Sequence, residues 1–111
     1  YRAWAAQLVK RGFRVALAHI RGGGCLGQRW YEEGKYEKKI NSFLDFNACA
    51  EDLIQKGYSK VKDISIWGGS AGGMLVGAAM NLKPELYRSV FAFVPFLDVL
   101  NTMLDETLPL T

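Results

Sequence analysis

Apolar residues recur along the chain in two alternating patterns, one with the spacing of a helix and one with the unbroken runs of a buried strand. Helices are predicted at about residues 2–10, 42–56 and 71–81, and strands at about 14–20, 63–67 and 88–94. Residues 21–40 are expected to form a long loop. Strands that are apolar at successive positions are typical of a parallel sheet covered on both faces. The alternation therefore predicts the α/β fold class.

The middle helix has the clearest pattern, because apolar residues recur at steps of three and four. They are Phe43, Phe46, Ala50, Leu53 and Ile54. Asn41 or Ser42 can cap its start, with Asp45 completing a capping box three residues after Ser42. Gly57 follows as a stop signal. The acidic residues of this helix are then expected to be outward-facing and structural.

Residues 64–73 carry the candidate chemistry. A short apolar strand breaks there into small residues around Ser70, and an apolar helix follows. This is the pattern of a nucleophile elbow, a strained turn that exposes a serine above a sheet, and Gly68 and Gly72 leave room for strand and helix to approach. The G-x-S-x-G pattern is common by chance, but a strand before it and a helix after it favour a true elbow. The alternative is a glycine-rich turn whose serine only caps the helix.

The length and composition limit the class of protein. An α/β-hydrolase sheet usually needs about 200 residues, so a chain of 111 residues that begins without methionine is expected to be part of one domain, truncated at both ends. Half of the residues are apolar and 23% are charged, as in soluble globular proteins. No apolar run approaches the ~18 residues that span a bilayer, so we expect no membrane segment.

The net charge of +3 is mild, and the lysines at 35, 38 and 39 alternate with the glutamates at 32, 33 and 37. Such a mixed patch is typical of a solvated surface, and its acidic residues would repel phosphate. The pattern therefore argues against nucleic acid as a partner.

Cys25 and Cys49 have neither metal-ligand spacing nor a disulfide framework. Cys49 lies on the apolar stripe of the middle helix and is expected to be a small buried side chain. This cysteine usage fits a reducing, cytoplasmic location.

The run of glycines from Gly22 to Gly24 follows the first predicted strand. It lacks the lysine and hydroxyl residue of a phosphate-binding loop, so a tight turn is favoured over a phosphate cradle. Arg21, just before it, is expected either to face the crevice at the sheet edge or to pair with a carboxylate. No cofactor is expected.

Four segments together resemble the catalytic domain of the prolyl oligopeptidase family of serine peptidases. They are HIRGGGCLG (19–27), RWYEEGK (29–35), IWGGSAGG (66–73) and PFLDVLNTMLDETLPLT (95–111). The last is most similar to oligopeptidase B and the prolyl endopeptidase-like proteins. The resemblance covers essentially the whole chain and implies a partial α/β-hydrolase fold, with a mostly parallel sheet and helices on both faces.

The resemblance implies that Ser70 is the acylating nucleophile and that the Ala71 backbone N–H donates to the oxyanion. A residue that opens a helix has no intrahelical partner for its N–H, which agrees with this role. The family's second oxyanion donor is a tyrosine upstream of this segment, and the role is not assigned to Tyr1. The family's aspartate and histidine lie downstream.

Two residues within the chain are further candidates for the triad. His19 is the only histidine, but it precedes the serine whereas the base of this fold comes last, so a hydrogen-bonded structural role is favoured. Asp98 follows the strand after the elbow helix, where a hydrolase acid occasionally lies, but the resemblance places the acid further on.

The resemblance implies a serine peptidase that hydrolyses short peptides through an acyl-enzyme, needs no cofactor and carries an N-terminal β-propeller in the full-length protein. An esterase or thioesterase of the prolyl endopeptidase-like kind, and a non-catalytic interaction protein that keeps the fold, are the alternatives. Residues 1–111 alone are expected to be inactive. Cys25 stands where the family usually has an acidic residue, so a strict preference for arginine and lysine is not implied.

Overall fold

The computed structural model describes residues 3–109 of the chain. The chain divides into two compact units, Tyr1–Lys60 and Val61–Thr111. Tyr1 and Arg2, the first residue of the first predicted helix, lie outside the described residues.

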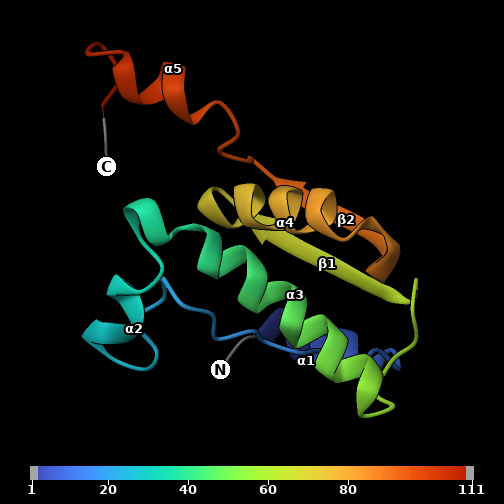
Figure 1. Cartoon of the computed structure of the whole chain (residues 1–111). Helices are drawn as coiled ribbons and strands as arrows, with labels where there is room; N and C mark the ends of the chain where they lie inside the picture. The colour runs from blue at the N-terminus through green and yellow to red at the C-terminus, as the bar shows by residue number, and fades with distance from the viewer. Residues whose placement is uncertain (1–2, 110–111) are drawn as a thin grey trace. The chain divides into compact units, whose positions relative to one another are not determined.

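The first unit is mainly helical (Figure 1). Its elements are α1 (Ala3–Lys10), α2 (Gln28–Glu32), the 3-10 turn η1 (Tyr36–Lys38) and α3 (Ile40–Gln55). The predicted helices 2–10 and 42–56 thus correspond to α1 and α3. The predicted loop 21–40 was too simple, because two short helical segments interrupt it.

The strand predicted at residues 14–20 is not formed. These residues have no regular secondary structure, and Leu17 is 52% exposed. A strand requires ladder hydrogen bonds to a neighbour, and no backbone group of the described residues pairs with this segment as a strand. The apolar run favours a strand, but a strand also needs a neighbouring strand to pair with, and none pairs with this segment in the described part of the chain.

The predicted start of α3 was also wrong. The helix begins at Ile40, and its N-cap Lys39 makes no side-chain capping bond. Asn41 and Ser42 lie within the first turn and bond to other segments, Asn41 to the Glu33 carbonyl at 2.8 Å and Ser42 to the Arg21 carbonyl at 2.6 Å. The side chains of Asn41 and Ser42 are therefore engaged in tertiary hydrogen bonds and do not cap the helix.

The predicted end of α3 is confirmed. Gly57 adopts a φ of +75°, a left-handed conformation that glycine enters without steric cost. Its N–H donates to the Ile54 carbonyl at 3.0 Å, and the Tyr58 N–H donates to the Leu53 carbonyl at 2.9 Å. This pair of bonds is the Schellman motif that satisfies the last carbonyls of a helix.

The apolar stripe of α3 is only partly buried. Ala50 is buried, whereas Phe43, Phe46, Leu53 and Ile54 are half-buried. Cys49 is half-buried too, and burial raises the pKa of its thiol. The predicted stripe is therefore the inward-facing side of α3, although most of its side chains are only half-buried.

The second unit is a β-α-β arrangement (Figure 1). Strand β1 (Ile64–Gly69) leads into helix α4 (Ala71–Leu82), and the 3-10 turn η2 (Pro84–Leu86) leads into β2 (Tyr87–Phe93). The short helix α5 (Val99–Leu104) follows. The strands are parallel, with Ser65 opposite Ser89 and Gly69 opposite Phe93. The strands predicted at 63–67 and 88–94, the helix between them and the parallel sheet are confirmed.

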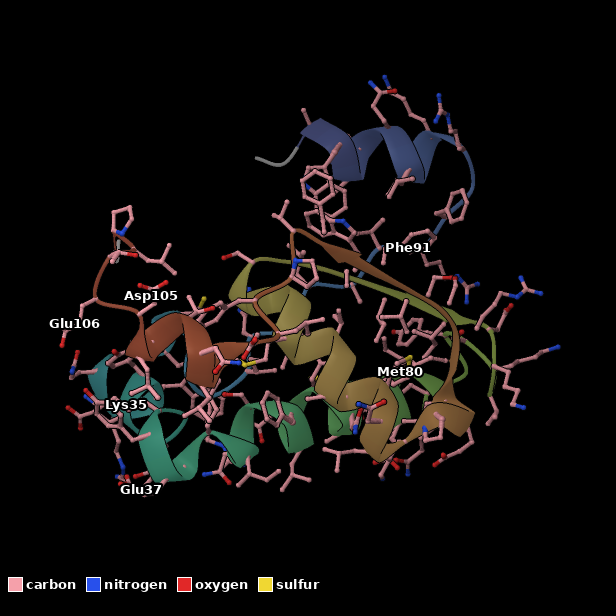
Figure 2. All side chains as sticks on the ribbon, turned by 90° about the horizontal axis from the view of Figure 1, so that it is seen from above. Lys35, Glu37, Met80, Phe91, Asp105 and Glu106 are labelled. Carbon is pink, nitrogen blue, oxygen red and sulfur yellow. The ribbon has the colours of Figure 1, made fainter. Side chains whose placement is uncertain are left out.

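Helix α4 packs on both strands. Ile66 and Gly68 are buried on β1, as is Val76 on α4, and a methyl group added to Gly68 would come 3.1 Å from Val76 Cγ1. Side chains alternate between the two faces of a strand, so Trp67 lies on the other face together with its register partner Phe91. Both are more than half exposed, and Figure 2 labels Phe91 on β2 and Met80 on α4.

Candidate active site

Ser70 lies at the sharp turn between the end of β1 at Gly69 and the start of α4 at Ala71. Its backbone has φ +54° and ψ −120°, a conformation that a residue with a Cβ rarely adopts. Such a conformation costs about 1–3 kcal/mol and persists only where the surroundings impose it. The local geometry is therefore that of a nucleophile elbow.

Two glycines make the close approach of strand and helix possible. A methyl group on Gly68 would overlap the Gly72 carbonyl, so this position needs glycine, as predicted. The prediction for Gly72 was wrong, because a methyl group there would meet nothing within 4 Å. The second crowded position is Gly73, where an added methyl group would lie 2.6 Å from Pro95 Cα.

The Ser70 side chain is not used as a helix cap. The residue is exposed, and its hydroxyl makes no capping hydrogen bond to α4. The interpretation of the serine as a mere N-cap is therefore wrong. The strained turn instead presents a hydroxyl with no hydrogen bond to any described residue.

The first N–H group of α4, that of Ala71, lies beside this hydroxyl. The N–H groups of Gly73 and Met74 donate to the Ser70 carbonyl at 2.9 and 3.3 Å, whereas that of Ala71 has no acceptor among residues 3–109. The N-terminus of a helix carries a partial positive charge, and its free N–H groups favour an anion. An unpaired donor and an exposed hydroxyl thus occupy adjacent residues.

The Ser70 backbone is bonded on both sides to the end of β2. Its N–H donates to the Phe93 carbonyl at 3.0 Å, and its carbonyl accepts from the Phe96 N–H at 3.0 Å. Sequence reasoning missed these two residues. The only sequence signal was Pro95 after an apolar strand, which marks a chain turn without indicating what the turn contacts.

The carboxylate of Asp98 is the N-cap of α5. Its Oδ1 accepts from the Asn101 N–H at 3.3 Å, and its Oδ2 accepts from Asn101 Nδ2 at 2.9 Å. Both carboxylate oxygens thus accept hydrogen bonds from Asn101, in the first turn of α5. This is a structural role.

His19 lies in residues 13–20 of the first unit, which have no regular secondary structure, and it is exposed. It makes no hydrogen bond within the described part of the chain. The bonded structural histidine that the sequence favoured is therefore not observed.

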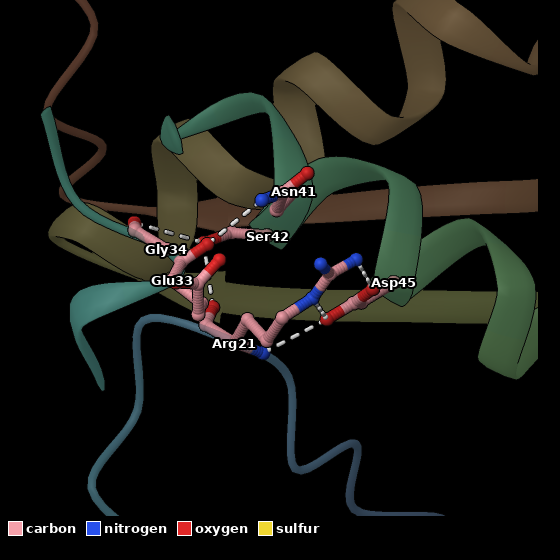
Figure 3. Close-up of polar contacts among 6 residues, drawn as sticks. All are labelled: Arg21, Glu33, Gly34, Asn41, Ser42 and Asp45. Carbon is pink, nitrogen blue, oxygen red and sulfur yellow. Dashed lines mark hydrogen bonds and ion pairs between the residues drawn. The ribbon is translucent and has the colours of Figure 1, made fainter. Parts of the chain in front are cut away.

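Arg21 pairs with a carboxylate, the second of its two predicted alternatives (Figure 3). Its Nε and Nη2 donate to the two oxygens of Asp45 at 2.8 and 2.6 Å, and its backbone N–H donates to Asp45 Oδ2 at 3.0 Å. The bidentate bond to Arg21 holds the pKa of the Asp45 carboxyl below its usual value, and the bond to Asp45 raises the pKa of the Arg21 guanidinium. Asp45 therefore has a structural role, as expected, but it faces a partner rather than open solvent.

The glycine run after Arg21 forms the predicted tight turn. The Gly23 N–H donates to the Ile20 carbonyl at 3.2 Å. Gly22 has a φ of +94°, and a methyl group there would lie 2.8 Å from Ser42 Oγ. The turn is thus fixed against the start of α3, and Cys25 is exposed in the loop that follows it.

The predicted mixed charge patch is confirmed by its pairings. Lys38 Nζ lies 2.7 Å from Glu33 Oε1, and this bond lowers the pKa of the Glu33 carboxyl. Lys35 Nζ lies 4.9 Å from the centroid of the Tyr31 ring. Within residues 3–109, no group of three potential metal ligands occurs, and no helix has the length and apolarity to cross a membrane.

Comparison with known proteins gives consistent matches. The family model Peptidase_S9, described as the prolyl oligopeptidase family, matches residues 1–111. Dipeptidyl aminopeptidase BI of Pseudoxanthomonas mexicana is 49% identical over 104 residues, which cover 94% of this chain and 14% of that protein. The prolyl endopeptidase-like protein of Rattus norvegicus is 50% identical over the same length, again 94% of this chain and 14% of the relative.

Among solved structures, oligopeptidase B from Trypanosoma brucei with covalently bound antipain, in its closed form, matches with a TM-score of 0.74 and 52% identity. The match covers 78% of this chain and 12% of that one. The chain thus spans about a seventh of the length of its curated relatives and a similar share of this structure. The matched proteins include oligopeptidase B and prolyl endopeptidase-like proteins, as the last segment of the sequence suggested. The chain belongs to the prolyl oligopeptidase family, and its parallel α/β fold is part of that family's α/β-hydrolase domain.

Proposed function

We propose that this chain supplies the nucleophile of a serine peptidase that hydrolyses short peptides through an acyl-enzyme. The observation that carries the proposal is the exposed Ser70 hydroxyl on a strained turn, next to the Ala71 N–H that has no acceptor among the described residues. The nucleophile and an oxyanion donor are both required for acyl transfer. Membership of the prolyl oligopeptidase family supports the same chemistry.

In this mechanism Ser70 Oγ attacks the carbonyl carbon of the scissile bond, and its proton passes to a general base. The developing oxyanion accepts a hydrogen bond from the Ala71 N–H. Loss of such a bond typically costs about 3 kcal/mol of transition-state stabilisation. The C–N bond then breaks, and the amine leaves with the proton. Water attacks the resulting ester, releases the carboxylic acid and restores the Ser70 hydroxyl.

The proton-transfer groups belong outside this chain in our proposal. His19 precedes the serine in the chain, and the Asp98 carboxylate caps α5. We therefore expect the histidine, the aspartate and a second oxyanion donor in other parts of the intact gene product. Residues 1–111 are then one piece of a catalytic domain, and they have no turnover by themselves.

Short peptides are the favoured substrates because several relatives are named as peptidases or proteases. We extend the proposal to an N-terminal β-propeller that limits substrate size and to a cytoplasmic location. Two free cysteines in the described residues support the second point. An esterase or thioesterase of the prolyl endopeptidase-like kind is the alternative, because six relatives of 43–50% identity are named prolyl endopeptidase-like.

Substitution of the nucleophile tests the proposal. In the intact gene product, Ser70→Ala should lower kcat/KM for a fluorogenic short peptide by at least about 10⁴-fold, because no other group can form the acyl-enzyme. Ser65→Ala is the matched control. Ser65 is an exposed serine of β1 that bonds to Ser89 Oγ at 2.7 Å, away from the turn, so its loss should leave kcat/KM unchanged.

The same pair of variants separates the alternatives. A peptide amide and a thioester with the same acyl group distinguish a peptidase from a thioesterase, and both activities should vanish in Ser70→Ala. Equal activity of Ser70→Ala and the unmodified protein on both substrates would contradict the proposal. An unmodified protein inactive on both would favour the non-catalytic interaction protein.

A further inference from the structure

The segment that leaves β2, residues 93–96, contacts the turn at Ser70 in a way that the sequence did not reveal. We call these four residues the strap. Its first residue closes β2, and its last donates to the Ser70 carbonyl. The strap and the turn both belong to the second unit, Val61–Thr111.

The strap bonds both polar groups of the Ser70 backbone. The Phe93 carbonyl accepts the Ser70 N–H, and the Phe96 N–H donates to the Ser70 carbonyl, each at 3.0 Å. The first bond continues the strand ladder by one residue, whereas the second is specific to this turn. Together they fix the peptide planes on both sides of the Ser70 Cα.

The strap also packs closely on the first turn of α4. A methyl group built on Gly73 would lie 2.6 Å from Pro95 Cα and 2.7 Å from Pro95 Cβ, distances that real Cβ atoms do not show. Any side chain at position 73 would therefore displace the strap. Gly77, one turn later, has space, because its added methyl group would meet Leu97 Cδ2 at 3.7 Å, an ordinary contact.

Backbone strain occurs on both sides of this contact. Val94 has a φ of +41°, which is an outlier for a β-branched residue, and Ser70 has a φ of +54°. The Val94 side chain is 70% exposed, so its packing does not hold the conformation. The conformation of Val94 is instead held by the hydrogen bonds that Phe93 and Phe96, on either side of it, make to the Ser70 backbone. A strained residue at a site of proposed chemistry indicates a positioning function.

We infer that the strap is a positioning element that holds the Ser70 hydroxyl in its reactive orientation beside the Ala71 N–H. The inference rests on the proposed function of Ser70 and adds a cause for its geometry. The strap acts through the Ser70 backbone, to which Phe93 and Phe96 are bonded, and a shift of about 1 Å at a reacting group can cost about 100-fold in rate.

The test is the rate at which a fluorophosphonate acylates Ser70 in the intact gene product. Gly73→Ala places a methyl group against Pro95 and should slow labelling of the folded protein by about 10- to 100-fold. Gly77→Ala is the matched control, one added methyl group on the same helix, and should label at the unmodified rate. Melting temperatures are measured for both, so that rates are compared well below unfolding.

A second variant guards against failure to fold. Pro95→Gly adds no atoms and frees the strap backbone, so it should fold and still label more slowly than the unmodified protein. A merely structural strap would lower the melting temperature of these variants without changing the labelling rate of the folded protein, and that result would overturn the inference. Absence of labelling in the unmodified protein would instead refute the proposed function of Ser70.

Discussion

Among single residues, the candidate site at Ser70 depends on backbone conformations with positive φ, which residues with a Cβ rarely adopt. Ser70 and Val94 both have positive φ, and the bonds of Phe93 and Phe96 connect them. The G-x-S-x-G pattern predicted strain at the serine, because small neighbours mark an elbow. Nothing in the sequence indicated strain at Val94, because a valine before a proline is expected to be extended. That conformation follows from contacts between segments.

The strain at Val94 has a measurable consequence for stability. Val94→Gly should raise the stability of the folded state by about 1 kcal/mol, because glycine adopts positive φ without the steric cost of a Cβ. The expected result is a higher melting temperature for the intact gene product. Val61→Gly is the control, an exposed valine with no positive φ, and should give no increase. A decrease in Val94→Gly as large as in the control would contradict the assignment of strain.

At the scale of elements, local patterns predicted the helices and the parallel β-α-β unit, but not the contacts between segments. The end of α3 followed from Gly57, a purely local signal. Its start did not follow from Ser42, because the hydroxyl bonds to the Arg21 and Gly34 carbonyls (Figure 3). Likewise, the crowding at Gly73 depends on Pro95, 22 residues later. Such tertiary bonds cannot be read from spacing.

The pair of Arg21 and Asp45 joins the glycine turn to α3, and its effect should depend on pH. The pKa of Asp45 is lowered in the folded state, so its stabilising contribution is present above the unfolded pKa and is lost as the pH falls through the folded value. Asp45→Asn should therefore lower the melting temperature at pH 7, and its difference from the unmodified protein should shrink as the pH falls below 3.8, the ordinary pKa of an aspartate.

Asp52→Asn is the matched control for this pair. Asp52 lies on the same helix as Asp45 and forms a single exposed ion pair with Lys56, at 2.8 Å. Such pairs contribute little to stability. Its effect on the melting temperature should be smaller at every pH. Equal effects of the two variants, or a difference for Asp45→Asn that does not change with pH, would contradict the role of the Arg21 pair.

At the scale of the whole molecule, the sequence motifs were sufficient to place the chain in its family, and the family model matches residues 1–111. The candidate site was predictable as far as it is local. Ser70 and Ala71 follow from one strand-turn-helix motif, whereas the strap that holds them follows from the fold. The strand predicted at residues 14–20 failed for a related reason, since a strand is defined by a partner that the pattern does not name.

The assignment of Ser70 as the nucleophile can be tested by mapping a covalent adduct. The intact gene product is treated with a fluorophosphonate, in which Ser70 Oγ would displace fluoride to form an O–P bond, and is then digested for tandem mass spectrometry. We expect a single adduct on Ser70, absent in Ser70→Ala and retained in Ser65→Ala. An adduct on another serine, or none on Ser70 in folded protein, would contradict it.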